Sequence, residues 1–585
     1  MPAAERQPGD RAADARILLL LMAVVAVVYG VALNNGFLLN WDDPNYVVNN
    51  RDAHGFSIEH LRHAFSRFYV GNYAPLQIVS YMLDYQLWGL RPAGYIGHNL
   101  LLHGLNGWLL YLAIVRITAR KQAALGAALL FLVHPLQVES VVWISQRKNL
   151  LAMLFFLLAL LGYQAYRSRP DAKAGYWAAL AFFGAALLAK SAAVVLPIGL
   201  LAYDRLVLGK SWRASGRSVL PFLLVAAGAG CLALVSQSAE FGGGGRAAYH
   251  GGSPLATALT MLPVFADYLR LLLLPVGLSG VYSPAIRQAV DPAVVLSAVA
   301  LLLALAGAWR LCRRERSLGF WLLLGLAGFL PVSQVVPLVT LMNDRYLYFP
   351  LAGLAPFAVL GLEQAAAAWP ANRRRLAVWG LLAVLAVFGL LAMARARVWQ
   401  NALTLWSDAV AKDSANNGAA YNLANVFLET GQFDRARPYV EQLVRSQPNT
   451  ARFQEMLGHY RYNTGDQDGA EQAYRRALAL NPNLAAAQLC LGNIYLARRD
   501  LVAAAAAFAA AEQSGQLTAD LAYSKACLLA LQGEPEQALA MLETAFRLGF
   551  AGCEAVLINP ELDGIRNSTE FTRILTTYCR QEGRK

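Results

Sequence analysis

Long apolar runs with almost no charge follow one another through the first 400 residues of the chain. Most are about 16 to 22 residues long, which as a helix crosses the ~30 Å hydrocarbon core of a bilayer. The twelve runs lie near residues 17–33, 94–115, 122–134, 149–166, 175–189, 191–204, 218–236, 258–276, 292–311, 318–338, 346–364 and 376–394. The pattern therefore predicts a polytopic helical membrane domain.

Short basic clusters divide these runs into pairs. The clusters lie around Arg11, Arg120, Lys173, Arg213, Arg313 and Arg374. If all six are cytoplasmic, as the positive-inside rule favours, only the interval 218–309 holds an odd number of runs. The run 258–276 carries Asp267 and Arg270, so we expect it to be interfacial or re-entrant. The prediction is eleven spans, a cytoplasmic N-terminus over residues 1–16, and a C-terminus on the opposite side.

The remaining chain repeats with a period of 34 residues. The recurring residues are Ala436, Ala470, Ala504 and Ala538; Leu423, Leu457 and Leu491; and Pro448 and Pro482. This period is typical of tetratricopeptide (TPR) repeats, each of which is a pair of helices. We expect an all-α chain: a membrane domain over 17–398, TPR repeats over 399–550 and a cap over 551–585. Such an array binds a peptide or protein on its concave face, or serves only as a stabilising platform.

Composition narrows the class further. The chain is 57% hydrophobic and 15% charged, whereas an ordinary soluble domain carries roughly 25% charge, which excludes a soluble enzyme. The formal charge is +13, yet residues 401–585 carry 17 basic and 20 acidic side chains. The surplus lies between the membrane runs, where it anchors helices, and we expect no nucleic-acid partner. The six cysteines have no metal-ligand spacing, and any disulfide pairing near the C-terminus is unreadable.

Two adjacent carboxylates open the large outer loop predicted over residues 34–93. Asp42 and Asp43 stand at a membrane surface, between Trp41 and Pro44. One of them can act as a general base toward an acceptor hydroxyl, while its neighbour orients the acceptor or a cation. The alternative is a solvated turn or helix cap, because Asp before Pro is common in turns.

A second polar group follows the third predicted span. It contains His134 and Glu139, and it ends with Arg147 and Lys148 at the start of the fourth span. On the predicted orientation these two cations face the outer side, against the positive-inside rule. A lipid phosphate bound at that interface would explain them, as would snorkelling from a helix end.

A third group is Asp344-Arg345-Tyr346 in the short outer loop after the tenth span. Arg345 between aromatic residues suits a phosphate or pyrophosphate clamp, or else it forms a local ion pair with Asp344. Lys190, in a break between two runs, is either a further phosphate contact or a helix cap.

Two histidines lie on the second predicted span. His98 and His103 are five residues apart, so on a helix their side chains diverge by roughly 140°. That divergence argues against a shared metal and favours hydrogen-bonded interior histidines.

In order and spacing these motifs resemble the transmembrane and TPR-containing O-mannosyltransferases and their bacterial relatives, within the GT-C glycosyltransferase superfamily. The segments that carry the resemblance are Trp41-Asp42-Asp43, Tyr73-Ala74-Pro75-Leu76, His98-Asn99, His134-Pro135 through Glu139, Arg147-Lys148-Asn149-Leu150 and Asp344 to Pro350. The resemblance covers nearly the whole chain.

The resemblance implies a GT-C membrane domain of about eleven spans whose first outer loop carries the catalytic carboxylate. It implies inverting transfer of a sugar from a polyprenyl phosphate to a protein or glycan hydroxyl, with Asp42 as the preferred base and Asp43 as the alternative. Donor-phosphate contacts would come from Arg345, Arg147, Lys148 and Lys190, and further pocket residues would be Tyr73, His98, His134, Glu139 and Tyr346. A divalent cation is compatible with this scheme, although relatives differ in metal use.

The expected setting is a bacterial inner membrane, with lipids around the spans. The active site and the TPR repeats would then share the periplasmic side, where the repeats recruit a protein acceptor. Two other functions stay open at this stage. One is a non-catalytic membrane-anchored TPR scaffold for envelope assembly, and the other is a lipid-linked oligosaccharide ligase or polymerase.

Overall fold

The computed structural model describes residues 8–169, 171, 173–237, 247–515 and 517–579. Helices make up the secondary structure of these residues, and the one β-bridge among them joins Tyr69 and Asn72. The all-α prediction is therefore confirmed. The chain forms two compact units, Met1–Asn416 and Asn417–Lys585. Residues 1–7 of the expected N-terminal segment and 580–585 of the expected cap lie outside the described residues.

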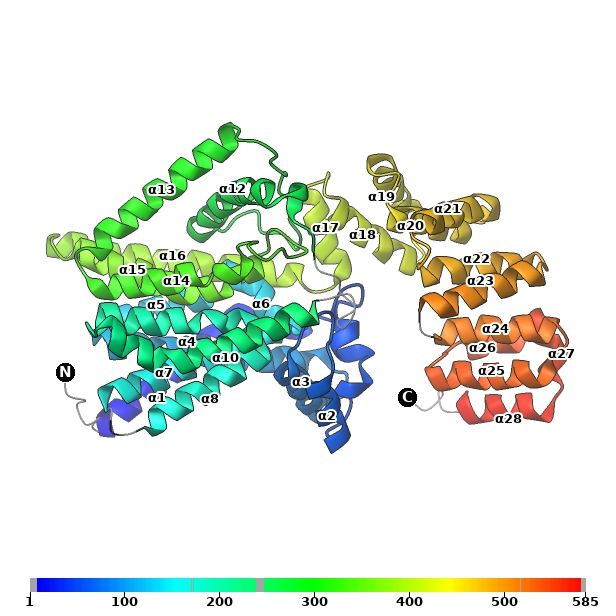
Figure 1. Cartoon of the computed structure of the whole chain (residues 1–585), viewed down its shortest axis with the longest axis horizontal. Helices are drawn as coiled ribbons and strands as arrows, with labels where there is room; N and C mark the ends of the chain where they lie inside the picture. The colour runs from blue at the N-terminus through cyan, green and yellow to red at the C-terminus, as the bar shows by residue number, and fades with distance from the viewer. Residues whose placement is uncertain (1–7, 170, 172, 238–246, 516, 580–585) are drawn as a thin grey trace. The chain divides into compact units, whose positions relative to one another are not determined.

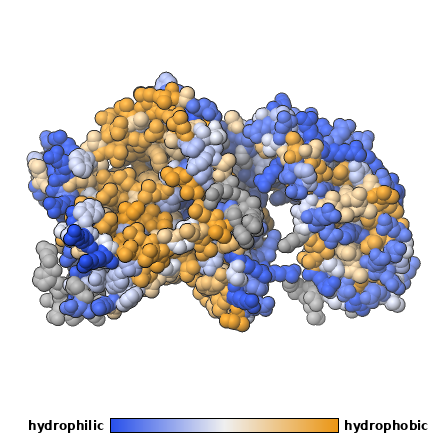
Figure 2. Space-filling model, in the orientation of Figure 1, coloured by the Kyte–Doolittle hydropathy of each residue, from blue (hydrophilic) through white to orange (hydrophobic). Residues whose placement is uncertain are grey.

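The first unit is a bundle of long apolar helices (Figure 1). Its main helices are α1 (Pro8–Tyr29), α4 (Pro92–Thr118), α5 (Lys121–Val133), α7 (Arg147–Ser168), α8 (Ala174–Ala189), α10 (Trp212–Ser236), α12 (Pro254–Leu273), α13 (Pro292–Cys312), α14 (Arg316–Ala327), α15 (Tyr348–Ala366) and α16 (Ala371–Val398). Figure 2 shows much of the surface of this unit in the orange of hydrophobic residues. An apolar outer surface on a helical bundle is what contact with lipid requires.

Within the described residues, eight helices are long and apolar enough to cross a membrane, or nine if the bent pair Lys121–Val133 and Pro135–Val142 counts as one span. Three of the predicted spans form shorter helices. They are α8, α14 and the run 191–204, which contains α9 (Leu196–Ala202) between a 3-10 turn and a π turn. With these three, the total is roughly consistent with the eleven spans predicted.

The helix α12 is long and apolar enough to cross a membrane. Its N-terminal and C-terminal residues nevertheless contact the same side of the bundle. Just before it, His250 contacts the Leu338 carbonyl oxygen at 2.8 Å. At its C-terminal end, the Leu272 carbonyl lies 3.1 Å from His134 Nε2, and the Tyr268 hydroxyl bonds to Asn343. This is the arrangement expected of a segment that enters and leaves on one side.

The predicted cytoplasmic ends of several helices meet at the other end of the bundle. Arg120, in the turn between α4 and α5, lies 3.1 Å from Glu315 and 3.4 Å from Glu363. These acids stand in the turn between α13 and α14 and near the end of α15. Three of the predicted basic turns therefore share one end.

The predicted outer loop is itself folded. It contains the turns η1 (Gly30–Asn34), η2 (Pro44–Val48) and η3 (Arg51–Ala53), and the helices α2 (Ile58–Ser66) and α3 (Pro75–Trp88). Six residues of α3 are buried, among them Gln77 and Asp84. Polar side chains are buried without large cost only when they are hydrogen-bonded, so this loop is an integral part of the unit.

The second unit consists of helix pairs with the 34-residue spacing that the sequence predicts. They are α18 (Asn417–Glu429) with α19 (Phe433–Ser446), α20 (Ala451–Asn463) with α21 (Gln467–Leu480), α22 (Ala485–Ala497) with α23 (Leu501–Ser514), and α24 (Ala519–Leu531) with α25 (Pro535–Leu548). Ala436, Ala470, Ala504 and Ala538 are all buried, each with no exposed surface. Small residues at these positions let the two helices of a repeat pack closely.

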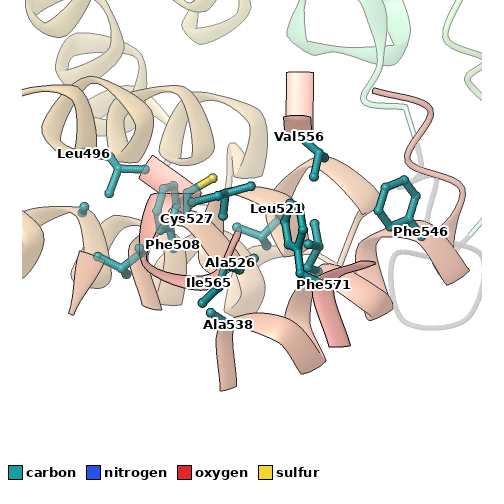
Figure 3. Close-up of a cluster of buried hydrophobic side chains, with 14 of the residues drawn as sticks. Leu496, Phe508, Leu521, Ala526, Cys527, Ala538, Phe546, Val556, Ile565 and Phe571 are labelled. Atoms are coloured by element: carbon teal, nitrogen blue, oxygen red, sulfur yellow. The ribbon is translucent and has the colours of Figure 1, made fainter. Parts of the chain in front are cut away.

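The cap is formed by the short helices α26 (Cys553–Ile558), α27 (Asp563–Arg566) and α28 (Thr569–Tyr578). Val556, Ile565 and Phe571 pack into one apolar cluster with residues of the last repeats (Figure 3). Cys553 and Cys579 form a disulfide. The cap thereby covers apolar surface that the last repeat would otherwise expose.

Candidate active site

The acidic pair lies in the turn after α1, and its two members have different surroundings. Asp43 is buried, and its carboxylate accepts hydrogen bonds from the Leu38 backbone N–H at 2.9 Å and from both the backbone N–H and the hydroxyl of Ser145. Burial raises the pKa of Asp43 to about 6, although these hydrogen bonds oppose that shift. Asp43 therefore joins the turn to a segment far away in the sequence.

Asp42 is half-buried, and no side-chain hydrogen bond or ion pair involves it among the described residues. Lys148 and Arg345 are close enough to interact with it electrostatically. Of the two carboxylates, Asp42 is the one with oxygen atoms available to a substrate. The sequence left the choice between Asp42 and Asp43 open, and the geometry favours Asp42.

Two lysines lie at the polar end of a cavity of about 360 Å³. Lys148 donates to the Tyr46 hydroxyl at 3.1 Å, and its ammonium lies 4.8 Å from the centre of the Tyr46 ring. Lys190 donates to the Asn149 side-chain carbonyl at 2.5 Å. The structure therefore brings together two of the predicted phosphate contacts, with Tyr73 lining the same cavity.

The rest of the cavity wall is apolar and comes from two membrane helices. The residues that line it are Gly184, Leu187, Leu188 and Ala189 on α8, and Val225, Gly228, Ala229, Leu232, Ala233 and Ser236 on α10, with Asn72, Ala74, Ser191 and Gln237 near the polar end. A groove with ammonium groups at one end and aliphatic walls beyond them matches an amphipathic ligand with an anionic head.

Arg345 and Glu139, predicted as separate site residues, contact each other. Glu139 is buried, and it accepts hydrogen bonds from the Arg345 backbone N–H at 2.8 Å and from the guanidinium. The guanidinium also lies 5.5 Å from the Trp143 ring and 5.4 Å from the Tyr346 ring. The local Asp344 pair considered from the sequence does not form, because Asp344 accepts from the Tyr282 hydroxyl at 2.6 Å instead.

Arg147 requires a correction, because it does not face the cavity. Its side chain is 1% exposed and forms an ion pair with Asp84, which is fully buried. It also donates to Asn99 at 2.8 Å and to the Tyr95 carbonyl at 2.5 Å. With these donors occupied, Arg147 holds α3 and α4 together, and the predicted phosphate contact is unsupported.

His134 is a second correction. It is buried, its Nδ1 accepts from the Leu136 backbone N–H at 3.3 Å, and its Nε2 contacts the Leu272 carbonyl at 3.1 Å. Both ring nitrogens are thus used in fixing the turn after α5, so His134 is a structural residue.

His98 and His103 have separate partners, as their helical spacing predicts. His98 Nδ1 bonds to Asp84, whereas His103 is buried and contacts the Tyr348 hydroxyl at 3.0 Å and the Leu132 carbonyl at 3.1 Å. His98 is not among the residues lining the cavity. Within the described chain, no group of three or more His, Cys, Asp or Glu side chains is arranged to hold a metal ion.

Several residues of the site could not be singled out from the sequence. Asp84 is the exception, because it lies in an apolar helix, where a carboxylate indicates either a functional role or a buried partner. The sequence could therefore have identified Asp84. Ser145, Tyr46 and Asn72 carry no comparable signal, because a hydroxyl or amide in a turn is common. Asn72 donates to the Tyr46 hydroxyl at 3.2 Å and thereby links the cavity rim to Lys148.

Comparison with known proteins bears on both units. Residues 86–238 match the family described as dolichyl-phosphate-mannose-protein mannosyltransferase. Residues 387–451, 421–485 and 455–517 match the tetratricopeptide repeat, which confirms that prediction. Protein O-mannosyl-transferase TMTC3 of Homo sapiens is 23% identical over 548 residues, covering 82% of this chain and 56% of that protein.

The chain is similar in sequence to the protein O-mannosyl-transferases. The predicted resemblance is thereby confirmed. Protein O-mannosyl-transferase TMTC4 of Homo sapiens is 32% identical over 224 residues, or 33% of this chain and 29% of that protein. TMTC3 of Mus musculus is 32% identical over 162 residues, or 26% of this chain and 17% of that protein. The matches thus span 56%, 29% and 17% of the lengths of these three O-mannosyl-transferases, which is little more than half at most.

Two solved structures are also similar. ArnT from Cupriavidus metallidurans, bound to undecaprenyl phosphate, is 18% identical and covers 80% of each chain at a TM-score of 0.39. The apo oligosaccharyltransferase of Archaeoglobus fulgidus is 15% identical and covers 70% of this chain and 59% of that one at a TM-score of 0.40.

Proposed function

We propose that this chain is a membrane glycosyltransferase of the GT-C superfamily. It would move a sugar from a polyprenyl phosphate to a hydroxyl of a protein or glycan acceptor. The observation that carries the proposal is the Asp42 carboxylate, which forms no hydrogen bond or ion pair in the described structure and interacts electrostatically with Lys148. Lys148 in turn lines the cavity between α8 and α10. The proposed base Asp42, the phosphate-binding Lys148 and the apolar groove would together form one active site.

The donor lipid fits this cavity by its chemistry. Lys148 and Lys190 would bind the phosphate, because a compact ammonium pairs well with a phosphate as a point charge. The first isoprene units would lie against the aliphatic residues of α8 and α10. Burying such a chain stabilises the complex by roughly 25 cal/mol per Å² of apolar surface removed from water.

The proposed chemistry needs one base. Asp42 takes the proton from the acceptor hydroxyl while that oxygen attacks the anomeric carbon from the face opposite the phosphate. The new bond joins the acceptor oxygen to the anomeric carbon, the carbon–oxygen bond to the phosphate breaks, and the configuration inverts. The phosphate leaves with its negative charge, which the nearby cations stabilise, so a second carboxylic acid of the glycosidase kind is not required.

Arg345 contributes from a distance in this proposal. Its guanidinium is partly neutralised by Glu139 and interacts electrostatically with Lys148 and Asp42. It therefore adds positive potential behind the leaving phosphate, whereas Lys148 and Lys190 make the contact. Tyr346 packs under the guanidinium.

A divalent cation would find few ligands among the predicted residues. Asp43 is occupied by Leu38 and Ser145, and Glu139 is occupied by Arg345. Asp42 has free oxygens, and donor phosphate and water would have to supply the rest of a coordination shell.

The proposed site lies on the extracytoplasmic side. Its residues are at the end of the bundle opposite the basic turn with Arg120, and cytoplasmic turns are enriched in Lys and Arg. A chain that begins in the cytoplasm and crosses an odd number of times carries its repeats on the same side as Asp42. We further propose a bacterial inner membrane, with the TPR repeats recruiting a protein acceptor.

The decisive experiment uses the full chain purified in detergent with a polyprenyl-phosphate sugar and acceptor peptides. We expect wild-type protein to release polyprenyl phosphate, and Asp42→Asn to reduce turnover by at least about 10²-fold, as expected from loss of a general base. Asp267→Asn, which removes an exposed carboxylate of α12, is the matched control and should keep full turnover.

The alternatives make different predictions in the same assay. A non-catalytic scaffold would release no lipid phosphate and would tolerate Asn at position 42 in cells. A ligase or polymerase would release lipid carrier only from donors with a larger glycan head. Full turnover by Asp42→Asn would remove the assigned base.

A further inference from the structure

Trp41, the residue before Asp42, packs among three other indole rings. Its ring centre lies 4.1 Å from that of Trp143, 4.9 Å from that of Trp406 and 6.1 Å from that of Trp399. Trp143, Trp399 and Trp406 are buried. We call these four residues the tryptophan cluster.

The tryptophan cluster is assembled from distant parts of the chain. Trp143 stands between α6 (Val138–Val142) and the turn η5 (Ile144–Gln146), Trp399 caps α16, and Trp406 lies in α17 (Ala402–Lys412). Among the described residues, the indole N–H groups of Trp143, Trp399 and Trp406 have no hydrogen-bond partner. Ring packing and burial of apolar surface therefore hold the cluster together.

Asp42 sits between two fixed neighbours. Trp41 is held by the tryptophan cluster on one side, and Asp43 is held by Leu38 and Ser145 on the other. The Asp42 side chain itself has no partner in the described structure. Its orientation toward a substrate is thus set through the backbone of its neighbours rather than by a contact of its own.

The same turn is tied to the end of α16. The Gly36 backbone N–H donates to the Gln400 carbonyl at 3.0 Å, and the Asn35 amide donates to the Ala396 carbonyl at 3.2 Å. The segment 35–43 and the segment 396–406 consequently form one packed structure, with Asp42 at its surface.

The helix α17 is also fixed on its other side. Asp408 accepts from Arg395 at 2.7 Å and from Lys412 at 2.7 Å, and Lys412 donates to the Leu278 carbonyl at 2.6 Å. Although its sequence continues the 34-residue repeat backwards, α17 belongs to the same compact unit as the membrane helices.

From this arrangement we infer that Trp406 is a positioning residue for Asp42, and that α17 is a working part of the catalytic unit rather than of the acceptor-binding repeats. The inference rests on the proposed function of Asp42. It names a residue outside the predicted membrane domain on which the orientation of the base depends.

The test compares three full-length variants in the transfer assay. Trp406→Ala opens a space beside Trp41, and kcat should fall roughly 10- to 100-fold with KM for donor and acceptor unchanged, because small misplacements of a catalytic group are costly. Trp406→Phe keeps a ring in place and should restore most of kcat. Trp321→Ala removes another buried indole, on α14, and should leave kcat unchanged at temperatures where it stays folded.

Two outcomes overturn the inference. In the first, Trp406→Ala keeps wild-type kcat. In the second, Trp406→Ala and Trp321→Ala lose kcat in proportion to their losses of thermal stability, which indicates a general packing defect. Absence of transfer by the wild-type chain would count against the proposed function instead.

A second measurement tests the positioning without catalysis. Asp42→Cys is labelled with a thiol reagent in the full chain, with and without Trp406→Ala, and the peptide containing residue 42 is quantified by mass spectrometry. We expect the labelling rate at residue 42 to change severalfold when Trp406 is truncated. Equal rates would overturn the inference whatever the activity assay gives.

Discussion

At the scale of single residues, the structure separates two adjacent carboxylates by their solvation. Asp43 is buried with a pKa raised to about 6, while Asp42 is half-buried and has free oxygens. A carboxylate that accepts several hydrogen bonds in the protein interior is suited to holding a turn. One with unoccupied oxygens beside cations is suited to taking a proton from a substrate. Adjacent acids can thus serve different purposes.

The raised pKa of Asp43 predicts a pH dependence of stability. Its pKa rises from 3.8 in the unfolded chain to about 6 in the folded one, so the folded state binds the proton more tightly. The stabilisation is full below about pH 4, falls as the pH rises toward 6 and is lost above that, with a total change of at most about 3 kcal/mol. Thermal unfolding of wild type and Asp43→Asn between pH 4 and 8 should show wild type losing stability relative to the variant as the pH rises, because Asn does not titrate. A gain in the stability of wild type relative to Asp43→Asn over that interval would contradict the assignment.

Arg147 and Lys148 show what sequence can and cannot give at this scale. The sequence predicts both cations at the start of the helix, and the structure places them in the first turn of α7. Which of them meets the cavity was not predictable, since neighbours on a helix point about 100° apart and the partners lie elsewhere. Arg147 faces Asp84 and Lys148 faces Tyr46. The roles follow from packing between α3, α4 and α7.

Arg147→Met should therefore damage the fold rather than donor binding. The substitution leaves Asp84 buried without its guanidinium partner, and breaking a buried pair costs about 3–5 kcal/mol. We expect a large fall in melting temperature.

Lys190→Met should impair donor binding rather than the fold. The donor KM should rise roughly tenfold, for one lost phosphate contact of about 1.4 kcal/mol, and the melting temperature should stay near that of wild type. Calorimetry and donor titrations distinguish the two.

At the scale of elements, hydropathy predicted most membrane helices because lipid contact requires long apolar helices. It missed features that depend on packing. The run 191–204 is broken into short turns around α9, and the outer loop contains α3 with buried polar residues. Those details depend on partners contributed by other helices. The cavity between α8 and α10 was likewise unpredictable, since glycine and alanine in a membrane helix do not reveal which face they line.

Two glycines on α10 test the cavity with a matched pair. Gly228 lines it and Gly230 does not, and a Cβ atom added at either position meets no atom within 4 Å. Gly228→Leu should fill part of the groove and raise the donor KM, whereas Gly230→Leu should leave it unchanged. Both variants should fold, because leucine favours a helix over glycine by roughly 0.5–1 kcal/mol. Equal KM values would show that the donor lies elsewhere.

At the scale of the whole molecule, the chain forms two compact units that meet in sequence at Asn416 and Asn417. Sequence periodicity extends the repeats back through Ala402, Trp406 and Ala409, which share the repeat spacing. The spacing of residues shows that α17 resembles a repeat helix. The division into compact units shows that α17 packs with the membrane helices. The repeats themselves were predictable because spacing alone defines them.

The disulfide gives a prediction for the repeat unit. Cys553 and Cys579 are separated by 26 positions in the sequence, and their bond should stabilise the cap by about 3 kcal/mol through the unfolded state. Cys579→Ser should lower the melting temperature of the repeat unit, while Cys231→Ser, at an exposed free cysteine, should have no effect. A free thiol at Cys553 in protein isolated from cells would argue against an oxidising compartment for the cap.

The cavity between α8 and α10 has a kinetic consequence. Two apolar helices form its walls, so in the proposed membrane setting a prenyl substrate would arrive by lateral diffusion within one leaflet. Its effective concentration is then a mole fraction in the lipid phase, and diluting the proteoliposomes in buffer should leave the rate per enzyme unchanged. Adding inert phospholipid at constant bulk donor should slow the reaction, as surface dilution does for interfacial enzymes.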